Sequence, residues 1–321
     1  MKRIGRLYSE ICSRENILLA DRIARRRKKR QASIIAFDKN FIANIDAIEK
    51  ELIEKTYRTS EYRTRTIYEK KERVISILPY RDRVVQHAVM IKLENLFVSM
   101  FTADTYSCIK GRGIHSASNK LKVALRDTKN SKFCLKLDIK KFYPSVDQRI
   151  LKNLLTRKFK DKDLINLLNG IIDSATGLPI GNYLSQYLAN FYLAYFDHWL
   201  KEKVGIKHYF RYADDMVILH SSKEYLGSLF TDIKAYLKRE LKLEVKPNRG
   251  VFRSDKGIDF LGYVHHPEHT ALRKSIKQDF ARKINKGITP LSKASYLGWT
   301  KHCNSKNLIK KLLPNTAINN S

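Results

Sequence analysis

Acidic residues are scarce in this 321-residue chain. It carries 32 Asp and Glu against 63 Lys and Arg, which gives a formal net charge of +31 at pH 7. Self-repulsion of that size is tolerated mainly when a polyanion neutralises it, so the charge indicates nucleic acid as the partner. With 43% hydrophobic residues the chain is still able to bury a sizeable core, as one large or two modest domains.

Cysteines and long apolar runs are also sparse. The four cysteines (Cys12, Cys108, Cys134 and Cys303) stand far apart, with no CxxC pair, which excludes a dense disulfide framework and indicates a reducing compartment. No apolar run approaches the roughly 18 to 20 residues of a membrane span, and the N-terminal residues lack the apolar segment of a secretion signal. We therefore expect a cytoplasmic protein without a targeting segment.

Hydrophobic periodicity predicts a mixture of helices and strands. The chain shows no internal repeat and no low-complexity linker. Helical spacing covers residues 40–57, 82–101, 147–171, 182–203, 224–240 and the basic tail 274–313. Alternating patterns predict strands at 64–80 (a pair around a charged turn), 131–137, 206–212, 216–220 and 258–265. The cationic block RIARRRKKRQ (22–31) is predicted to be helical and to contact RNA phosphates.

Histidines near the C-terminus raise the question of a zinc site. His265, His266 and His269 lie in HHPEH, and His302 and Cys303 are adjacent further on. Their spacing matches no standard zinc finger, so we interpret HHPEH as a solvated turn.

Two adjacent aspartates interrupt an apolar run in YFRYADDMVIL (209–219). An Asp pair in a hairpin is by itself more often a turn or a cap. Burying Asp214 beside Asp215 without a partner costs several kcal/mol, and a divalent cation removes this penalty. Mg²⁺ prefers hard oxygen ligands such as carboxylates. Asp138 ends an alternating strand, so a sheet could bring it to the hairpin tip and complete a site for two Mg²⁺ ions, with Mn²⁺ as a substitute.

Three motifs occur in order along the chain: LDIKKFYPSVD (137–147), GLPIGNYLSQ (177–186) and YADD (212–215). Together they resemble the active-site motifs of the reverse transcriptase family, over about residues 65–300. The resemblance implies an RNA-directed DNA polymerase, a nucleotidyltransferase. It also implies an α+β right-hand fold with fingers, a palm built on an antiparallel sheet packed by helices, and a short helical thumb. We expect a basic extension at 1–37, fingers at 38–132, a palm at 133–270 (with 147–180 helical) and a basic thumb at 271–321.

The resemblance assigns the metal site and its surroundings. Asp138 and Asp214 become the main ligands, the carbonyl of Ile139 an additional one, and Asp215 completes the acidic cluster. Tyr212 would lie under the primer terminus. Tyr143 matches the aromatic residue that closes over the sugar 2′ position and favours deoxynucleotides, with Phe142 as the alternative.

Further positions follow from neighbouring motifs. RVISILPYRDRVVQ (73–86) resembles the fingers motif whose arginine reaches the incoming triphosphate. Arg73 is the first candidate because its planar fork meets phosphate bidentately, and Lys71, Arg81 and Arg83 could equally be ordinary surface charges. The remaining candidates are Ile180 and Gly181 at the nucleotide, and Ser185, Gln186, Arg112 and Gly262 at the template and primer. Lys246 or Arg249 stands where the family has a lysine near pyrophosphate, although arginine is a poor proton donor.

The motif at 180–186 suggests a subfamily. Ile180 replaces a glutamine that usually restrains the incoming nucleotide, and the IGxxxSQ form resembles reverse transcriptases of diversity-generating retroelements from bacteria and phages. That resemblance implies adenine-directed, error-prone cDNA made from a template-repeat RNA for mutagenic retrohoming, and a small basic helical accessory protein that forms a pentamer. The partners would then be template RNA, the cDNA/RNA heteroduplex and dNTPs. The alternatives are a retron, group II intron or defence-associated reverse transcriptase, or a non-catalytic RNA-binding palm protein.

Overall fold

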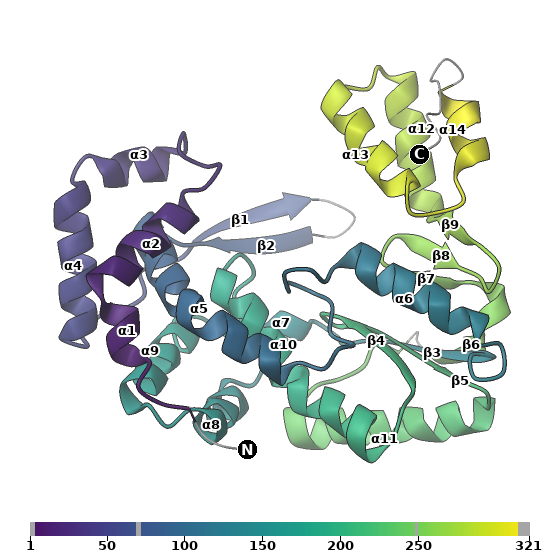
Figure 1. Ribbon diagram of the computed structural model, residues 1–321, viewed down its shortest axis with the longest axis horizontal. Helices are drawn as coiled ribbons and strands as arrows, with labels where there is room; N and C mark the ends of the chain where they lie inside the picture. Colours follow the sequence, from purple (N-terminus) through teal and green to yellow (C-terminus); the bar gives the residue numbers. More distant parts are fainter. Residues whose placement is uncertain (1–3, 69–71, 248–249, 314–321) are drawn as a thin grey trace. The chain divides into compact units, whose positions relative to one another are not determined.

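The chain folds into two compact units. The computed structural model describes residues 4–68, 72–247 and 250–313 (Figure 1). The first unit comprises Met1–Thr102, Ile139–Leu200 and Ala235–Glu244, and the second comprises Ala103–Asp138, Lys201–Lys234 and Val245–Ser321. Helices and antiparallel sheets occur together, so the predicted α+β class is confirmed. The expected divisions at residues 37, 132 and 270 stay predictions.

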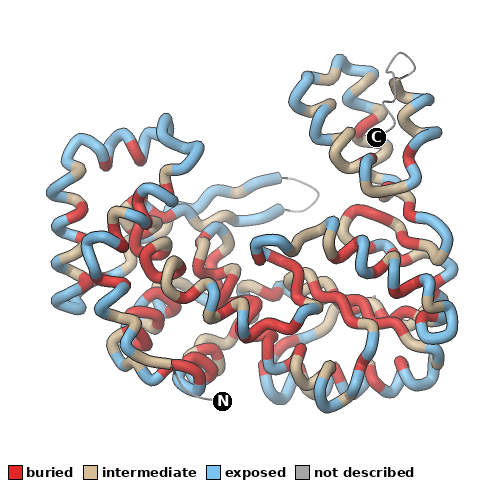
Figure 2. The backbone as a smooth tube through the Cα atoms, viewed as in Figure 1, coloured by how far each residue is buried: buried red, intermediate tan, exposed pale blue. Residues whose placement is uncertain are grey.

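The first unit is mainly helical. Its elements are α1 (Tyr8–Cys12), α2 (Arg14–Ala24), α3 (Ala32–Asp38), α4 (Phe41–Ile53), β1 (Arg63–Tyr68), β2 (Glu72–Ile77), α5 (Tyr80–Met100), α7 (Phe142–Ser145), α8 (Gln148–Lys158), α9 (Lys162–Ile172) and α10 (Tyr183–His198). The two helices α5 and α10 pack together and are buried on more than one face, so they form its core (Figure 2). No helix in the described ranges has both the length and the apolar character that crossing a membrane requires.

The antiparallel hairpin β1-β2 confirms the strand pair predicted around the charged turn. The Ser76 N–H on β2 donates a 2.7 Å hydrogen bond to the Ile180 carbonyl. Next to it, Asn182 Nδ2 donates to the Tyr62 hydroxyl at 2.8 Å. The hairpin is thereby attached to the loop that carries the 177–186 motif.

The cationic block was predicted to be helical, and this is wrong for most of it. Helix α2 ends at Ala24, and residues 25–30 form turns, with Arg27 at a φ of 61°. Like charges three or four positions apart repel on a helix surface, and this block has no acid to separate them. Arg25 instead pairs with Asp21 and Asp38 at 2.7 and 2.9 Å.

The second unit is built on a sheet of order β4-β5-β3-β6. Its strands and covering helices are α6 (Ile114–Arg126), β3 (Phe133–Asp138), β4 (His208–Tyr212), β5 (Asp215–His220), α11 (Lys223–Leu241) and β6 (Gly250–Arg253). Helix α6 packs on one face through Leu121 and Leu125 against Val217 and Phe210. Residues 223–234 of α11, which belong to this unit, lie on the opposite face (Figure 1). Both faces are covered, which explains why the middle of β5 is buried on each side.

The C-terminal part of this unit carries a smaller antiparallel sheet and further helices. They are β7 (Ile258–Phe260), β8 (Tyr263–His265), β9 (Thr270–Leu272), α12 (Lys274–Asn285), α13 (Pro290–Thr300) and α14 (Lys306–Leu312). Leu261 and Gly262 join β7 to β8 with φ of 53° and 88°, as a two-residue hairpin turn requires. A Cβ on Gly262 would come within 2.6 Å of Trp299 Cζ3, so only glycine fits there.

The interpretation of HHPEH as a solvated turn is wrong at its first residue. His265 ends strand β8 and is fully buried, with its Nδ1 3.4 Å from Thr270 Oγ1. Burial lowers the pKa of His265 to about 4. The alternation of β8 places Tyr263 and His265 on the same inward face, which the polar sequence around them did not reveal.

Candidate active site

Strand pairing brings the acidic residues together in the second unit. Strands β3 and β5 are antiparallel, and their register places Asp138 opposite Asp215. Residues opposite each other in such a pair project from the same face, with Cβ atoms about 5 Å apart. Asp214 precedes Asp215 in the turn that joins β4 to β5. The strand end and hairpin tip predicted from sequence are therefore adjacent.

The carboxylate of Asp214 is perturbed by burial and by its neighbour Asp138. Burial raises the pKa of Asp214, and the neighbouring charge of Asp138 raises it further. Lys246 partly offsets this repulsion, since its Nζ donates to Asp138 Oδ1 at 2.6 Å and its N–H to the Asp138 carbonyl at 2.9 Å. Lys136 Nζ lies 3.6 Å from Asp215 Oδ1. Lys246 and Lys136 thus compensate part of the negative charge of these aspartates.

The donor set at this position suits a divalent cation. Within the described ranges, no group of three or more His, Cys, Asp or Glu side chains is arranged to hold a metal ion as it stands. Asp138 and Asp214 nevertheless supply adjacent hard oxygens that already attract a cation, the ammonium of Lys246. A metal ion would take over that charge compensation, with Asp215 directly across the strand pair.

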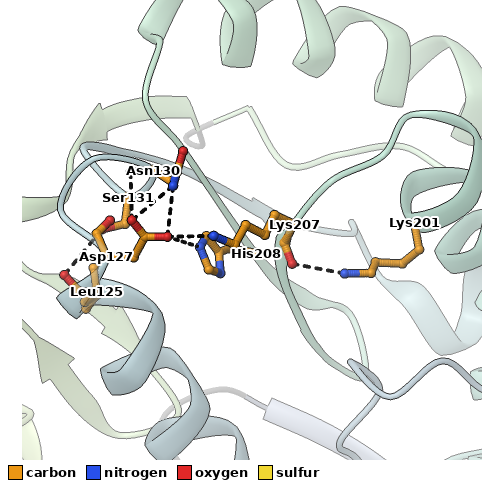
Figure 3. Close-up of polar contacts among 7 residues, drawn as sticks. All are labelled: Leu125, Asp127, Asn130, Ser131, Lys201, Lys207 and His208. Atoms are coloured by element: carbon orange, nitrogen blue, oxygen red, sulfur yellow. Dashed lines mark hydrogen bonds and ion pairs between the residues drawn. The ribbon is translucent and has the colours of Figure 1, made fainter.

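The beginning of β4 is held by a polar cluster around Asp127 (Figure 3). Its carboxylate accepts from Lys207 Nζ at 2.8 Å, lies 3.3 Å from His208 Nε2, and also accepts from Asn130. These hydrogen bonds, led by the one from Lys207, hold the pKa of Asp127 well below its usual range. The cluster ties the end of α6 to the strand that leads into YADD.

In the first unit, Gly181 lies where the chain comes very close to β2. Its φ is 118°, a conformation that side chains rarely adopt, and a Cβ there would overlap the Ser76 carbonyl oxygen. Gly181, Arg83 and Gln186 border one cavity of about 450 Å³ between β2, α5 and α10. Candidates assigned from two separate motifs, Arg83 from one and Gly181 and Gln186 from the other, therefore line the same cavity.

Sequence reasoning missed Gln86 at this cavity. The side chain is 2% exposed, and its Oε1 accepts from the Leu184 N–H at 3.4 Å, which orients the amide. Its Nε2 has no hydrogen-bond partner in the described part of the chain. Arg83 is half-buried, which lowers its pKa, and it donates to Ser33 Oγ at 2.8 Å. The amino-acid pattern predicts neither the contact of Gln86 with Leu184 nor that of Arg83 with Ser33.

Tyr143 lies in α7 and is half-buried beside Phe142, whose ring centroid is 5.6 Å away. The Tyr143 carbonyl accepts from the Leu178 N–H at 2.9 Å, which joins the first motif to the second. Ile139, directly after Asp138 in sequence, is buried in the first unit. Ile180 is half-buried.

The other candidates occupy varied environments. Arg73 is exposed on β2, whereas Arg81 forms an ion pair with Glu51 at 2.5 Å. Arg112 donates to the Thr105 carbonyl at 3.2 Å. Ser185 is buried in α10, and Tyr212 packs against the core beneath α6. Lys71 and Arg249 lie outside the described residues, so the choice between Lys246 and Arg249 is informed only by the contact of Lys246 with Asp138.

The fold and the acidic strand pair define a class, the polymerases that carry their carboxylates on an antiparallel palm sheet. Residues 55–265 match the family described as reverse transcriptase (RNA-dependent DNA polymerase), which is more than half of the chain. The chain belongs to the reverse transcriptase family.

Relatives include a retron enzyme and intron-encoded proteins. The retron Ec73 reverse transcriptase of Escherichia coli is 28% identical, over 71% of this chain and 72% of its own length. Protein YkfC of E. coli (strain K12) is 24% identical, covering 69% and 71%. The group II intron-encoded protein LtrA of Lactococcus lactis subsp. cremoris is 25% identical, over 56% of this chain but only 32% of LtrA.

Solved structures agree on the fold. Apo telomerase from Candida tropicalis superposes with a TM-score of 0.51 at 10% identity, over 71% of this chain and 52% of that one. Telomerase from Candida albicans in complex with a telomeric RNA fragment gives 0.52 at 9% identity, over 82% and 58%. The predicted right-hand polymerase fold is confirmed, and the chain spans little more than half the length of these telomerases.

Proposed function

We propose that the protein is an RNA-directed DNA polymerase that extends a primer along an RNA template. One observation carries this proposal: the β3-β5 register that sets Asp138 opposite Asp215, with Asp214 in the adjoining turn, in a member of the reverse transcriptase family. Asp138 and Asp214 would hold two Mg²⁺ ions, or Mn²⁺ instead, with Asp215 and the Ile139 carbonyl as further donors. When bound, the ions activate the primer hydroxyl and neutralise charge on the leaving pyrophosphate.

The remaining candidates divide into substrate contacts of two kinds. Arg73 is exposed and free to approach a triphosphate, with Lys71 and Arg83 as further cations. Tyr143, Ile180 and Gly181 would shape the nucleotide site. The template and primer contacts would come from Tyr212, Ser185, Gln186, Arg112 and Gly262. Lys246, already beside Asp138, is the better proton donor toward pyrophosphate than Arg249.

The decisive measurement is dNTP incorporation on a primed RNA template with Mg²⁺ or Mn²⁺. Asp214→Asn should abolish incorporation, by about 10³-fold or more, because the lost carboxylate is a charge the metal requires. Asp232→Asn, on the exposed face of α11, serves as the matched control and should keep wild-type activity. Incorporation that survives in Asp214→Asn would reject the assignment.

For the subfamily, we propose a reverse transcriptase of a diversity-generating retroelement. Support comes from Ile180 and the IGxxxSQ form, because an aliphatic residue in place of a hydrogen-bonding one relaxes discrimination. Its cDNA should carry errors mainly opposite template adenines, and Ile180→Gln should reduce them. The protein should also co-purify with a small basic helical pentameric protein. An unchanged error spectrum in sequenced cDNA from Ile180→Gln would count against this subfamily.

The relatives favour a second candidate, a retron or group II intron type of enzyme. The retron Ec73 reverse transcriptase matches over 72% of its length. Such an enzyme would copy an adenine-containing template without a bias at adenine. The two candidates therefore separate in the same cDNA sequencing experiment.

A further inference from the structure

Arg211 is a buried cation immediately before YADD. It lies in β4 and is 0% exposed. Burying a guanidinium is costly unless its donors are used. Arg211 Nη1 donates to the Ala213 carbonyl at 3.1 Å, and Nη2 donates to Thr105 Oγ1 at 3.4 Å. The side chain thus reaches forward to the turn that carries Asp214.

The segment 104–107 runs beside β4 and forms backbone hydrogen bonds with Arg211. The Arg211 N–H donates to the Asp104 carbonyl at 2.9 Å, and the Arg211 carbonyl accepts from the Tyr106 N–H at 3.0 Å. Thr105 and Ser107 are both buried. Because water is excluded, these hydrogen bonds hold their partners more tightly than surface contacts would.

Ala213 has a conformation that needs such support. Its φ is 53°, in the left-handed region that residues with a Cβ disfavour. Both of its peptide groups are engaged: its N–H donates to Ser107 Oγ at 3.1 Å, and its carbonyl accepts from Arg211. A residue gripped on both sides fixes the direction in which the next residue, Asp214, leaves the turn.

We propose that Arg211, Thr105 and Ser107 form a clamp that positions Asp214 for catalysis. The inference rests on the proposed polymerase activity and names positioning residues for it. The clamp holds the left-handed turn in place while the carboxylates of Asp214 and Asp138, which repel each other, are brought together. None of the three side chains touches substrate in this role.

The main test compares Arg211→Met with wild type in steady-state primer extension. A displacement of about 1 Å at a reacting group costs on the order of 100-fold, so kcat should fall about 100-fold. The KM for dNTP should stay within about twofold, since no substrate contact is lost. Ser107→Ala removes one bond of the clamp at little cost to folding and should lower kcat about tenfold.

A rescue separates positioning from mere stabilisation. Glycine adopts positive φ without the clamp, so Arg211→Met combined with Ala213→Gly should recover about tenfold of the lost kcat. Arg211→Met combined with Ala235→Gly, an exposed alanine on α11, loosens the chain elsewhere and should recover nothing. If Arg211→Met does not fold, Ser107→Ala alone and with Ala213→Gly carries the same comparison.

The outcomes are distinct. Folded clamp variants with wild-type kcat, a loss confined to KM, or equal rescue by both glycines would overturn the clamp. A wild-type protein that incorporates no dNTP would reject the proposed function instead. In that case the clamp is still tested by Mn²⁺ titration followed by electron paramagnetic resonance. Ser107→Ala should bind Mn²⁺ about tenfold more weakly than wild type, and an unchanged Mn²⁺ affinity would refute the clamp.

Discussion

Gly181→Ala should damage both stability and catalysis. At a φ of 118° any side chain is strained, which costs about 1–3 kcal/mol. The new Cβ would also overlap the Ser76 carbonyl oxygen, so β2 and the loop must separate. Separation weakens the 2.7 Å hydrogen bond from the Ser76 N–H to the Ile180 carbonyl, worth about 1 kcal/mol. We expect the free energy of unfolding to fall by about 2–4 kcal/mol.

The same displacement should move the loop that we assign to the nucleotide. We expect kcat/KM for dNTP to fall about 100-fold, measured by primer extension on an RNA template, with denaturant unfolding measured in parallel. Gly170→Ala is the matched control, since a Cβ there meets nothing within 4 Å and α9 gains about 0.5–1 kcal/mol from the exchange. If Gly181→Ala retains the wild-type free energy and kcat/KM, or if the two alanine variants behave alike, the close approach of β2 has no functional importance.

Three other predictions concern charge. Buried His265 has a pKa of about 4 in the fold against about 6.5 in the unfolded chain, so the unfolded chain binds the proton first as the pH falls. The free energy of unfolding should therefore decrease by up to about 3 kcal/mol from pH 6.5 to pH 4. His265→Phe should remove this decrease in unfolding curves measured across that pH range. Lys246→Met should lower the Tm measured without metal, because the carboxylate of Asp138 loses its cation. The rise in Tm on adding Mg²⁺ should be larger in this variant than in wild type, since the ion then binds uncompensated carboxylates. An equal rise in wild type would contradict this. The affinity for an RNA/DNA heteroduplex should fall steeply as the salt concentration rises. Lys277→Gln on α12 should reduce the slope of log K against log salt concentration by about 0.7–0.9. An unaltered slope would show that Lys277 makes no phosphate contact.

Local patterns were enough to predict the centre of the candidate site. The alternation of residues 131–137 ends at Asp138, and the apolar runs on both sides of Asp214 and Asp215 predict a hairpin. Both signals depend on the two-residue period of a strand and on short-range turn chemistry. The pairing that joins them is long-range: the strand pattern allowed it as one possibility, and the family resemblance favoured it. The structure then gave the register.

Buried polar side chains escaped prediction for a physical reason. Arg211 and His265 would be assigned to the surface by residue type, yet both are fully buried because neighbouring segments supply their hydrogen-bond partners. Helix α6 was also missed, although Leu121 and Leu125 recur at helical spacing and Gly113 precedes it. The turns at residues 25–30 were also missed, and there Arg25 pairs with Asp38, 13 positions further along the chain, a contact that local spacing does not predict.

The pairing of Asp138 with Asp215 restricts where the gene can gain or lose codons. A strand alternates its side chains between two faces, so one residue inserted within β3 or β5 would turn a carboxylate toward the opposite side of the sheet. Extra residues in the connections between helices leave that alternation unchanged. Evolution and protein engineers alike can therefore lengthen this chain between its strands, while the strands themselves permit exchange of residues but no change in their number.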